Sequence, residues 1–286
     1  MNNYYLKKLE FYKILEILKN FCSTISGKEI ASNLLPSNDK EQVVKILSET
    51  EEAISLSYRN SFPSFYNFSD ITTEIKILES GTSLSTKSLL NLAYILKNAE
   101  DLKKYFNKDF LDSSSYPILS GYFEALYSNK SISDRILSCI LDENTIDDNA
   151  SKTLNTIRRK SRNLEQNIRN KLNDMIHSSK FSKIIQENII TIRNDRFVIP
   201  IKEEYRSQIK GFIHDISNAG STVFIEPISV FEMNNELNRL KLDEELEIEK
   251  ILYGLSSLLI PYIEELVNNT LVIRKIRFYI CKSKVF

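Results

Sequence analysis

Apolar residues recur every three or four positions through most of the chain, a spacing that predicts helices. The first such stretch covers residues 5–35, and others cover residues 39–59, 71–80, 86–106 and parts of 118–142, separated by breaks rich in serine, glycine and proline. The apolar positions of the opening stretch are Leu6, Leu9, Ile14, Ile17, Leu18 and Phe21. The first half of the chain is therefore predicted to be an all-α bundle, stabilised by packing between amphipathic faces.

Two longer periodic runs follow, and each predicts an arm helix. The first starts near Ser151, and at roughly 1.5 Å per residue it would be about 40 Å long if it reached Ser178. The second follows Pro227, with Glu244 breaking its apolar spacing. Because the runs match in length, we expect an antiparallel pair. The positions at heptad spacing, all apolar except Ser161, are Ala150, Leu154, Ile157, Ser161, Leu164, Ile168 and Met175 in the first run, and Met233, Leu237, Leu240, Ile248, Ile251, Leu255, Leu258 and Tyr262 in the second.

Residues 191–227, between these two runs, have a different pattern. β-branched and aromatic residues cluster in short runs, which predicts strands over 191–193, 196–202, 211–215 and 222–226. Asn194-Asp195 and residues 218–221 are typical of turns. The predicted fold class is mainly α: a helical core bundle with a long antiparallel two-helix arm that carries a small antiparallel β unit.

The charges balance overall but are segregated along the chain. The 286 residues contain 38 basic and 38 acidic side chains, yet residues 151–190 are net basic and residues 228–267 are net acidic. Opposite charges on the two arm helices would favour their pairing with each other, although each face could also meet a separate partner. Neither alternative is excluded by the sequence.

Composition narrows the class of protein. The three cysteines have no metal-binding spacing, and an odd number favours reduced thiols in a cytoplasmic protein. The N-terminus does not resemble a secretion signal, and no apolar run is long enough to span a membrane, so we expect a cytoplasmic protein with no membrane partner. The histidines, cysteines and carboxylates predict neither a metal site nor a catalytic constellation, so this segment is not expected to be an enzyme.

The segment TIRNDRFVIPIKEEYRSQIKGFIHDISNAGSTVFIEP, residues 191–227, resembles the clamp of the second MutS-type family of bacteria, whose members lack the mismatch-reading N-terminal domains. Phe197, Asn218 and Ala219 depart from the residues usual in that family. The opening LEFYKILEIL and the later NNELNRLKLDEELEIEKIL are also similar to it. The resemblance therefore extends over nearly the full chain.

This resemblance implies a division into a core or lever domain (1–148), an ascending arm helix (149–190), a β clamp unit (191–227) and a descending arm helix that returns to the core (228–286). In such proteins an ATPase domain that uses ATP and magnesium follows, often with a C-terminal Smr endonuclease domain. The one Gly-Lys pair, Gly27-Lys28, has Cys22 where a phosphate loop needs glycine, so no cofactor is expected in this segment. The apolar and basic run at residues 271–286 leads us to expect that the chain continues.

Members of the family are homodimers that encircle nucleic acid. The resemblance implies either branched DNA, in suppression of recombination, or RNA of collided ribosomes, in ribosome rescue. It does not distinguish these ligands. The alternative is a structural coiled-coil scaffold for dimerisation that makes no contact with nucleic acid.

Nine cations are the candidate contacts to nucleic acid, and each has a structural alternative. The clamp set could hold phosphates without reading sequence, or form a solvated face balanced by Asp195, Glu203, Glu204 and Asp215. The arm set could contact nucleic acid, or pair with the acidic arm helix. The clamp set is Arg193, Arg196, Lys202, Arg206 and Lys210, and the arm set is Arg158, Arg159, Lys160 and Arg162.

Two further features of the sequence have simpler explanations. His214-Asp215 with Ser217 and Ser221 is not interpreted as a hydrolytic triad, because strand alternation separates the histidine and the aspartate. The histidine and serines are expected to stabilise hairpin turns. The cations near the C-terminus are candidates for contact with a following domain: Arg274, Lys275, Arg277, Lys282 and Lys284.

Overall fold

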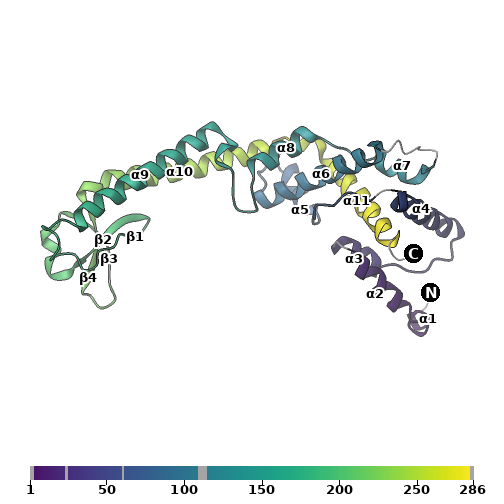
Figure 1. The fold of residues 1–286 in the computed structure, drawn as a ribbon, viewed down its shortest axis with the longest axis horizontal. Coiled ribbons are helices and arrows are strands. Elements are labelled where there is room, and N and C mark those ends of the chain that lie inside the picture. The colour runs from purple at the N-terminus through teal and green to yellow at the C-terminus, as the bar shows by residue number, and fades with distance from the viewer. Residues whose placement is uncertain (1–2, 23–24, 60, 109–114, 284–286) are drawn as a thin grey trace. The chain divides into compact units, whose positions relative to one another are not determined.

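The computed structural model describes residues 3–22, 25–59, 61–108 and 115–283 (Figure 1). They form two compact units, Met1–Asp147 with Leu252–Phe286, and Asp148–Ile251. Helices dominate, and the strands form one small antiparallel sheet, which confirms the predicted fold class. No described helix is long and apolar enough to cross a membrane, and no described group of three histidines, cysteines or carboxylates could hold a metal ion.

The first unit is a helical bundle built around α6. Leucines and isoleucines of this helix are fully buried, and α8, α7 and α11 pack against it. Helix α11 also contacts α4 and α3, so the C-terminal helix holds much of the unit together. The helices are α1 (Asn3–Lys8), α2 (Phe11–Phe21), α3 (Ile25–Ser32), α4 (Lys40–Arg59), α5 (Thr72–Glu79), α6 (Thr86–Lys108), α7 (Pro117–Glu124), α8 (Lys130–Cys139) and α11 (Ile263–Ser283), with a 3-10 turn at Ile260–Tyr262.

The N-terminal helices bury less than their apolar spacing suggests. Leu18 and the neighbouring Cys22 pack against α3 and α11, through Ala31, Phe278 and Cys281. Several apolar residues predicted to lie on the same packing face are exposed instead: Leu9, Ile14, Ile17 and Phe21. Periodicity identified an apolar face, but the described neighbours of α2 cover only part of it.

The second unit is the arm pair with its sheet. It contains a 3-10 turn (Asp148–Ala150), α9 (Lys152–Ile176), β1 (Thr191–Arg193), β2 (Arg196–Lys202), a second 3-10 turn (Glu203–Gln208), β3 (Gly211–Ile216), β4 (Thr222–Pro227) and most of α10 (Ile228–Ser257). All strand pairs are antiparallel, in the order β1-β2-β4-β3. Asn194 and Asp195 have positive φ angles of 49° and 59°, as a tight hairpin turn requires, and these residue types tolerate that conformation.

Helices α9 and α10 run antiparallel, side by side (Figure 1). Ser151, at the start of α9, donates to Glu247 late in α10, and Met175, at its end, contacts Ser229 at the start of α10. Near the sheet both helices bury apolar side chains against the strands. This core contains Ile168, Leu172, Ile176, Val230 and Leu237 from the helices and Phe197, Ile199, Ile201, Val223 and Ile225 from β2 and β4.

The structure corrects the extent and the packing face of the first arm helix. Helix α9 ends at Ile176, and residues 177–190 form turns and a short bridge in which Ile185 pairs with Ile201. Toward that end Leu172 and Ile176 are buried, whereas Met175, which the heptad spacing selected, is only half-buried. The heptad spacing assumed a helical partner, but this end of α9 packs against the sheet.

Candidate nucleic-acid interface

The sheet formed by β1, β2, β4 and β3, here called the clamp sheet, is held to α10 by a buried carboxylate, that of Glu226 at the end of β4. Its side chain is 0% exposed, and its two oxygens accept hydrogen bonds from Arg196 Nη1, Oε1 at 2.9 Å and Oε2 at 3.1 Å. His214 Nε2 lies 2.6 Å from it, and Asn234 Nδ2 of α10 donates to it at 2.7 Å. Arg196 also donates to Asn235 of α10. The guanidinium of Arg196, a predicted nucleic-acid contact, is therefore bound to Glu226 and Asn235, in a cluster that joins β2, β3, β4 and α10.

The other cations of the predicted clamp set differ in their exposure and in whether a carboxylate pairs with them. Arg193 donates to Asp215 at 3.0 Å and lies over the ring of Phe224, 4.3 Å from its centre. Arg206 is exposed and 3.8 Å from Glu203, a loose pair. Lys202 is half-buried and Lys210 exposed, and neither forms an ion pair within the described part of the chain.

Of the residues that could suggest catalysis, Ser217 stabilises a hairpin turn as expected, whereas His214 binds the buried carboxylate of Glu226 instead. Ser217 Oγ accepts a hydrogen bond from the backbone N–H of Thr222, which closes the β3–β4 hairpin. Asp215 bonds to Arg193 rather than to His214, whose partner is Glu226. The register between β3 and β4 shifts between Ile213 and Asp215, so a bulge lies at His214.

On the arm, two predicted cations are engaged in ion pairs. Arg158 donates to Glu244 of α10 at 2.8 Å and to Asp148 at 2.7 Å, and Arg162 donates to Asp148 at 2.9 Å. Burial works to lower the pKa of Arg158, but its bonds to Glu244 and Asp148 outweigh burial and raise it. The hydrogen bonds that Asp148 accepts from Arg158 and, to a smaller extent, from Arg162 lower the pKa of its carboxyl group. Glu244, which interrupts the apolar spacing of α10, thus forms an ion pair with Arg158 of α9.

The remaining cations of α9 point to solvent. Arg159 and Lys160 are exposed and form no ion pair within the described residues. Arg169 and Lys171, which were not among the predicted site residues, are exposed on the same helix, and Arg169 lies 4.8 Å from the ring centre of Phe197. We call the exposed half of this helix the α9 outer face; its polar residues are Lys152, Thr153, Arg159, Lys160, Arg162, Asn163, Gln166, Asn167, Arg169, Asn170, Lys171, Asn173 and Asp174.

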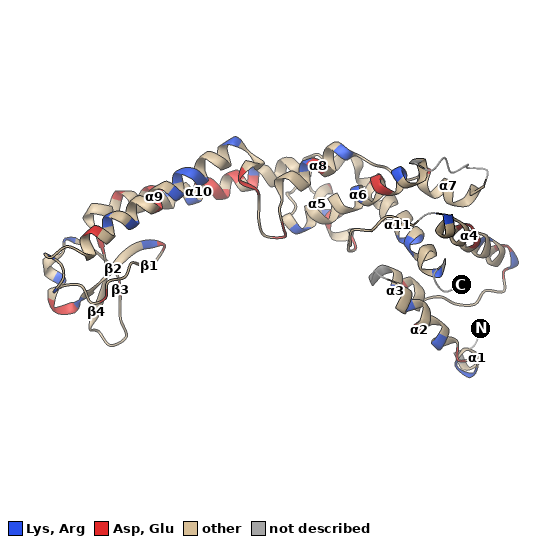
Figure 2. Ribbon diagram, viewed as in Figure 1, with Lys and Arg blue, Asp and Glu red and all other residues tan. Residues whose placement is uncertain are grey.

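The α9 outer face is rich in cations and side-chain amides. Within α9, all of which is described, Asp174 is the one exposed carboxylate. Figure 2 shows basic residues along α9 and acidic residues along α10. The helical spacing of the amides could have identified this face from the sequence, because they recur on the side opposite Leu154, Ile168 and Leu172, with Arg169 and Lys171 at its edges.

The C-terminal cations differ in exposure: Arg277 is buried within the first unit, whereas Lys275 is exposed. Arg277 is 3% exposed and lies between the rings of Phe65 and Phe68. Burial lowers its pKa to about 10. Arg274 is 3.4 Å from Asp70, and Lys275 and Lys282 lie over aromatic rings of the same unit. Lys284 lies outside the described residues.

Three curated proteins that are similar to this chain share one name. No protein-family model matches the chain. A protein named Endonuclease MutS2 from Acetivibrio thermocellus is 41% identical over 285 residues, which is 100% of this chain and 36% of that protein. Proteins of the same name from Clostridioides difficile and Ruminiclostridium cellulolyticum are each 39% identical, again over 100% of this chain. The chain thus spans 36% of the length of these relatives, and the match confirms the resemblance seen in the sequence.

Proposed function

Because this chain is a MutS2 homologue along its whole length, we propose that it is the core and clamp region of a MutS-type ATPase that closes around nucleic acid. The ligand is branched DNA or the RNA of a stalled ribosome. The segment itself positions nucleic acid and performs no chemistry.

The α9 outer face is the observation that carries this proposal. Lysine and arginine bind phosphates through charge, and asparagine and glutamine donate to phosphate and sugar oxygens, so such a face holds a backbone without reading its sequence. Arg159 and Lys160 keep their charge available, since no described carboxylate pairs with them. Lys202, Arg206 and Lys210 would add contacts at the clamp sheet.

The paired cations support a separate, positioning role. Arg158 and Arg162 fix α9 to its neighbours, and Arg196 fixes the sheet to α10, so their replacement would act through the shape of the arm. These pairs also favour the second candidate function, a dimerisation scaffold without nucleic-acid contact. That function predicts self-association that is insensitive to the charge of the α9 outer face.

We assign the ATPase and endonuclease activities to regions outside this segment, in a full-length chain as long as those of the relatives. ATP and magnesium would bind in an ATPase domain outside this segment, and the endonuclease activity in the relatives' name would reside there too. We further propose that the full-length protein is a homodimer, so that two arms enclose the ligand.

Binding of the chain to a four-way DNA junction and to ribosomes tests the proposal. The double variant Arg159→Glu, Lys160→Glu is expected to weaken binding at least tenfold, because two attractive contacts become repulsive. The double variant Arg239→Glu, Lys250→Glu, which reverses two exposed cations of helix α10, is the matched control and should leave the affinity unchanged. Equal effects of the two changes, or no binding to either ligand at low salt, would contradict the proposal.

A further inference from the structure

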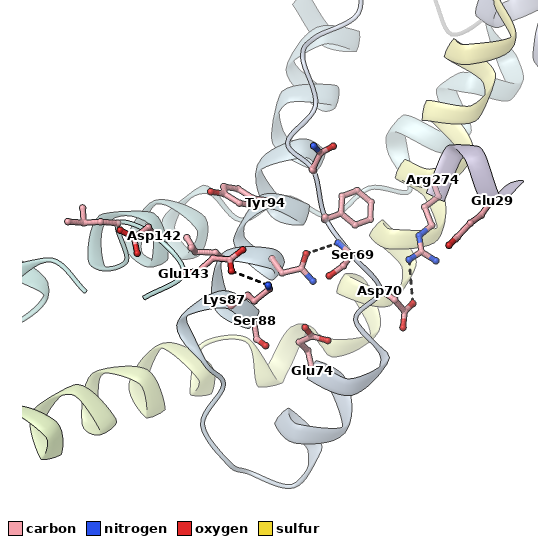
Figure 3. Close-up of a pocket in the computed structure, with 15 residues that line it drawn as sticks. Glu29, Ser69, Asp70, Glu74, Lys87, Ser88, Tyr94, Asp142, Glu143 and Arg274 are labelled. Carbon is pink, nitrogen blue, oxygen red and sulfur yellow. Dashed lines mark hydrogen bonds and ion pairs between the residues drawn. The ribbon is translucent and has the colours of Figure 1, made fainter. Parts of the chain in front are cut away.

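The first unit contains a pocket that the nucleic-acid proposal does not use. Its cavity volume is about 680 Å³, and it lies between the segment before α5, helix α6, the loop after α8 and helix α11 (Figure 3). Apolar side chains form part of its wall. They include Phe68, Leu90, Tyr94 and Leu141, the last of which is 61% exposed although it is a leucine.

The charged groups around this pocket leave an excess of carboxylates. Both cations are already engaged: Lys87 is 3.0 Å from Glu143, and Arg274 is 3.4 Å from Asp70, as Figure 3 shows. Three carboxylates in the lining have no ion-pair partner within the described residues: Glu29, Glu74 and Asp142. A bound phosphate or nucleotide would be repelled, whereas a cation would be attracted.

A buried amide in the lining also lacks a partner. Asn91 of α6 is 8% exposed, and its Oδ1 accepts a hydrogen bond from the backbone N–H of Ser69 at 2.9 Å. Its Nδ2 has no hydrogen-bond acceptor among the described residues. About two turns further along α6, Asn98 satisfies both ends of its amide on Tyr66: its Oδ1 accepts from the Tyr66 N–H and its Nδ2 donates to the Tyr66 carbonyl, each at 2.9 Å. A buried donor without an acceptor is costly, so Asn91 favours a ligand that supplies an oxygen.

We propose that this pocket binds an arginine or lysine side chain presented by an extended segment of a partner protein. The apolar wall covers the aliphatic stem, Glu74 holds the charged head, and a main-chain carbonyl of the segment accepts from Asn91 Nδ2. Charge complementarity selects this occupant over nucleic acid. The protein thus has a peptide-binding site in its helical core, separate in chemistry from the α9 outer face.

The test uses the whole chain and a small probe with the proposed chemistry, Nα-acetyl-arginine N-methylamide, which carries one guanidinium and two amide carbonyls. Methyl NMR spectra of Leu90 and Leu141 report on the pocket. We expect saturable shifts with a dissociation constant in the millimolar range, typical of so small a ligand, on the order of 1 mM. The neutral citrulline analogue should bind at least about tenfold more weakly, because it lacks the charge.

Variants locate the probe. Glu74→Gln should weaken binding about fivefold, as should Asn91→Ala, whereas Glu124→Gln, an exposed carboxylate of α7 outside the pocket, should have no effect. Because Glu74→Gln preserves shape, its result does not depend on how well Asn91→Ala folds. The proposal is overturned if the probe causes no saturable shift, if citrulline binds equally well, if Glu74→Gln and Glu124→Gln behave alike, or if inorganic phosphate binds more tightly than the probe.

Discussion

Replacement of Glu226 by alanine is the sharpest perturbation of the clamp. This carboxylate is fully buried and accepts hydrogen bonds from Arg196, His214 and Asn234, which belong to β2, β3 and α10. Alanine removes the acceptor from all of them at once. The Arg196 side chain, 21% exposed, would then keep its charge without its main partner.

The expected loss follows from these contacts. Removing one partner of a buried ion pair costs about 3–5 kcal/mol, because the remaining charge is left without compensation. Arg196 keeps its bond to Asn235 and some contact with water, which places the loss near the lower end, about 3 kcal/mol. Glu226→Gln preserves one oxygen acceptor and should cost less, about 2 kcal/mol.

Hydrogen exchange measured by mass spectrometry is the suitable assay, because it reports the opening of the sheet separately from the rest of the chain. Amides of β2 and β4 should exchange roughly a hundredfold faster in Glu226→Ala, as about 3 kcal/mol implies. Glu204→Ala, an exposed acid of the same unit, is the control. Exchange rates in Glu226→Ala that match this control would refute the reasoning that Glu226 holds the clamp.

Three further predictions concern stability and reactivity. Gly211→Ala should destabilise the sheet by about 1–3 kcal/mol in urea unfolding, because its methyl would press on the main-chain oxygen of Glu226; an unchanged midpoint would contradict this. Burial, followed by the neighbouring thiol of Cys281, raises the pKa of Cys22 to about 12. At pH 8 Cys22 should therefore react with Ellman's reagent roughly a thousandfold more slowly in the folded chain than in urea. Similar rates in the two states would contradict this prediction. The pKa of Asp148 is lowered in the folded state by two arginines, so its contribution is present above the unfolded pKa of about 4 and is lost as pH falls through the lower folded value. The difference in unfolding free energy between wild type and Asp148→Asn should therefore shrink below about pH 4, and a constant difference would argue against the pairing.

Much of the fold follows from local sequence patterns. The strands and the Asn194-Asp195 turn were predicted from residues adjacent in the chain, and so were most helices. The segregation of charge between the two arm runs agrees with the bond between Arg158 and Glu244. Such features depend on propensity and periodicity, which a single sequence displays directly.

The site depends on contacts that the sequence does not display. The link from Glu226 to His214 requires the β3–β4 register and its bulge, and the link to Asn234 requires the first turns of α10 to lie over the sheet. Sequence patterns also could not show which apolar face of α2 is covered.

The salt dependence of DNA-junction binding tests the central claim most directly. The logarithm of the association constant should fall linearly with the logarithm of the salt concentration, with a slope of about −0.9 for each phosphate contact. Neutralising Arg159, Lys160, Arg169 and Lys171 with glutamine should make that slope shallower by about 3 to 4, because each cation releases about one counterion. The control Arg239→Gln, Lys250→Gln on α10 should keep the wild-type slope. A slope that is the same in the wild type and in the four-residue variant would contradict a nucleic-acid interface on the α9 outer face.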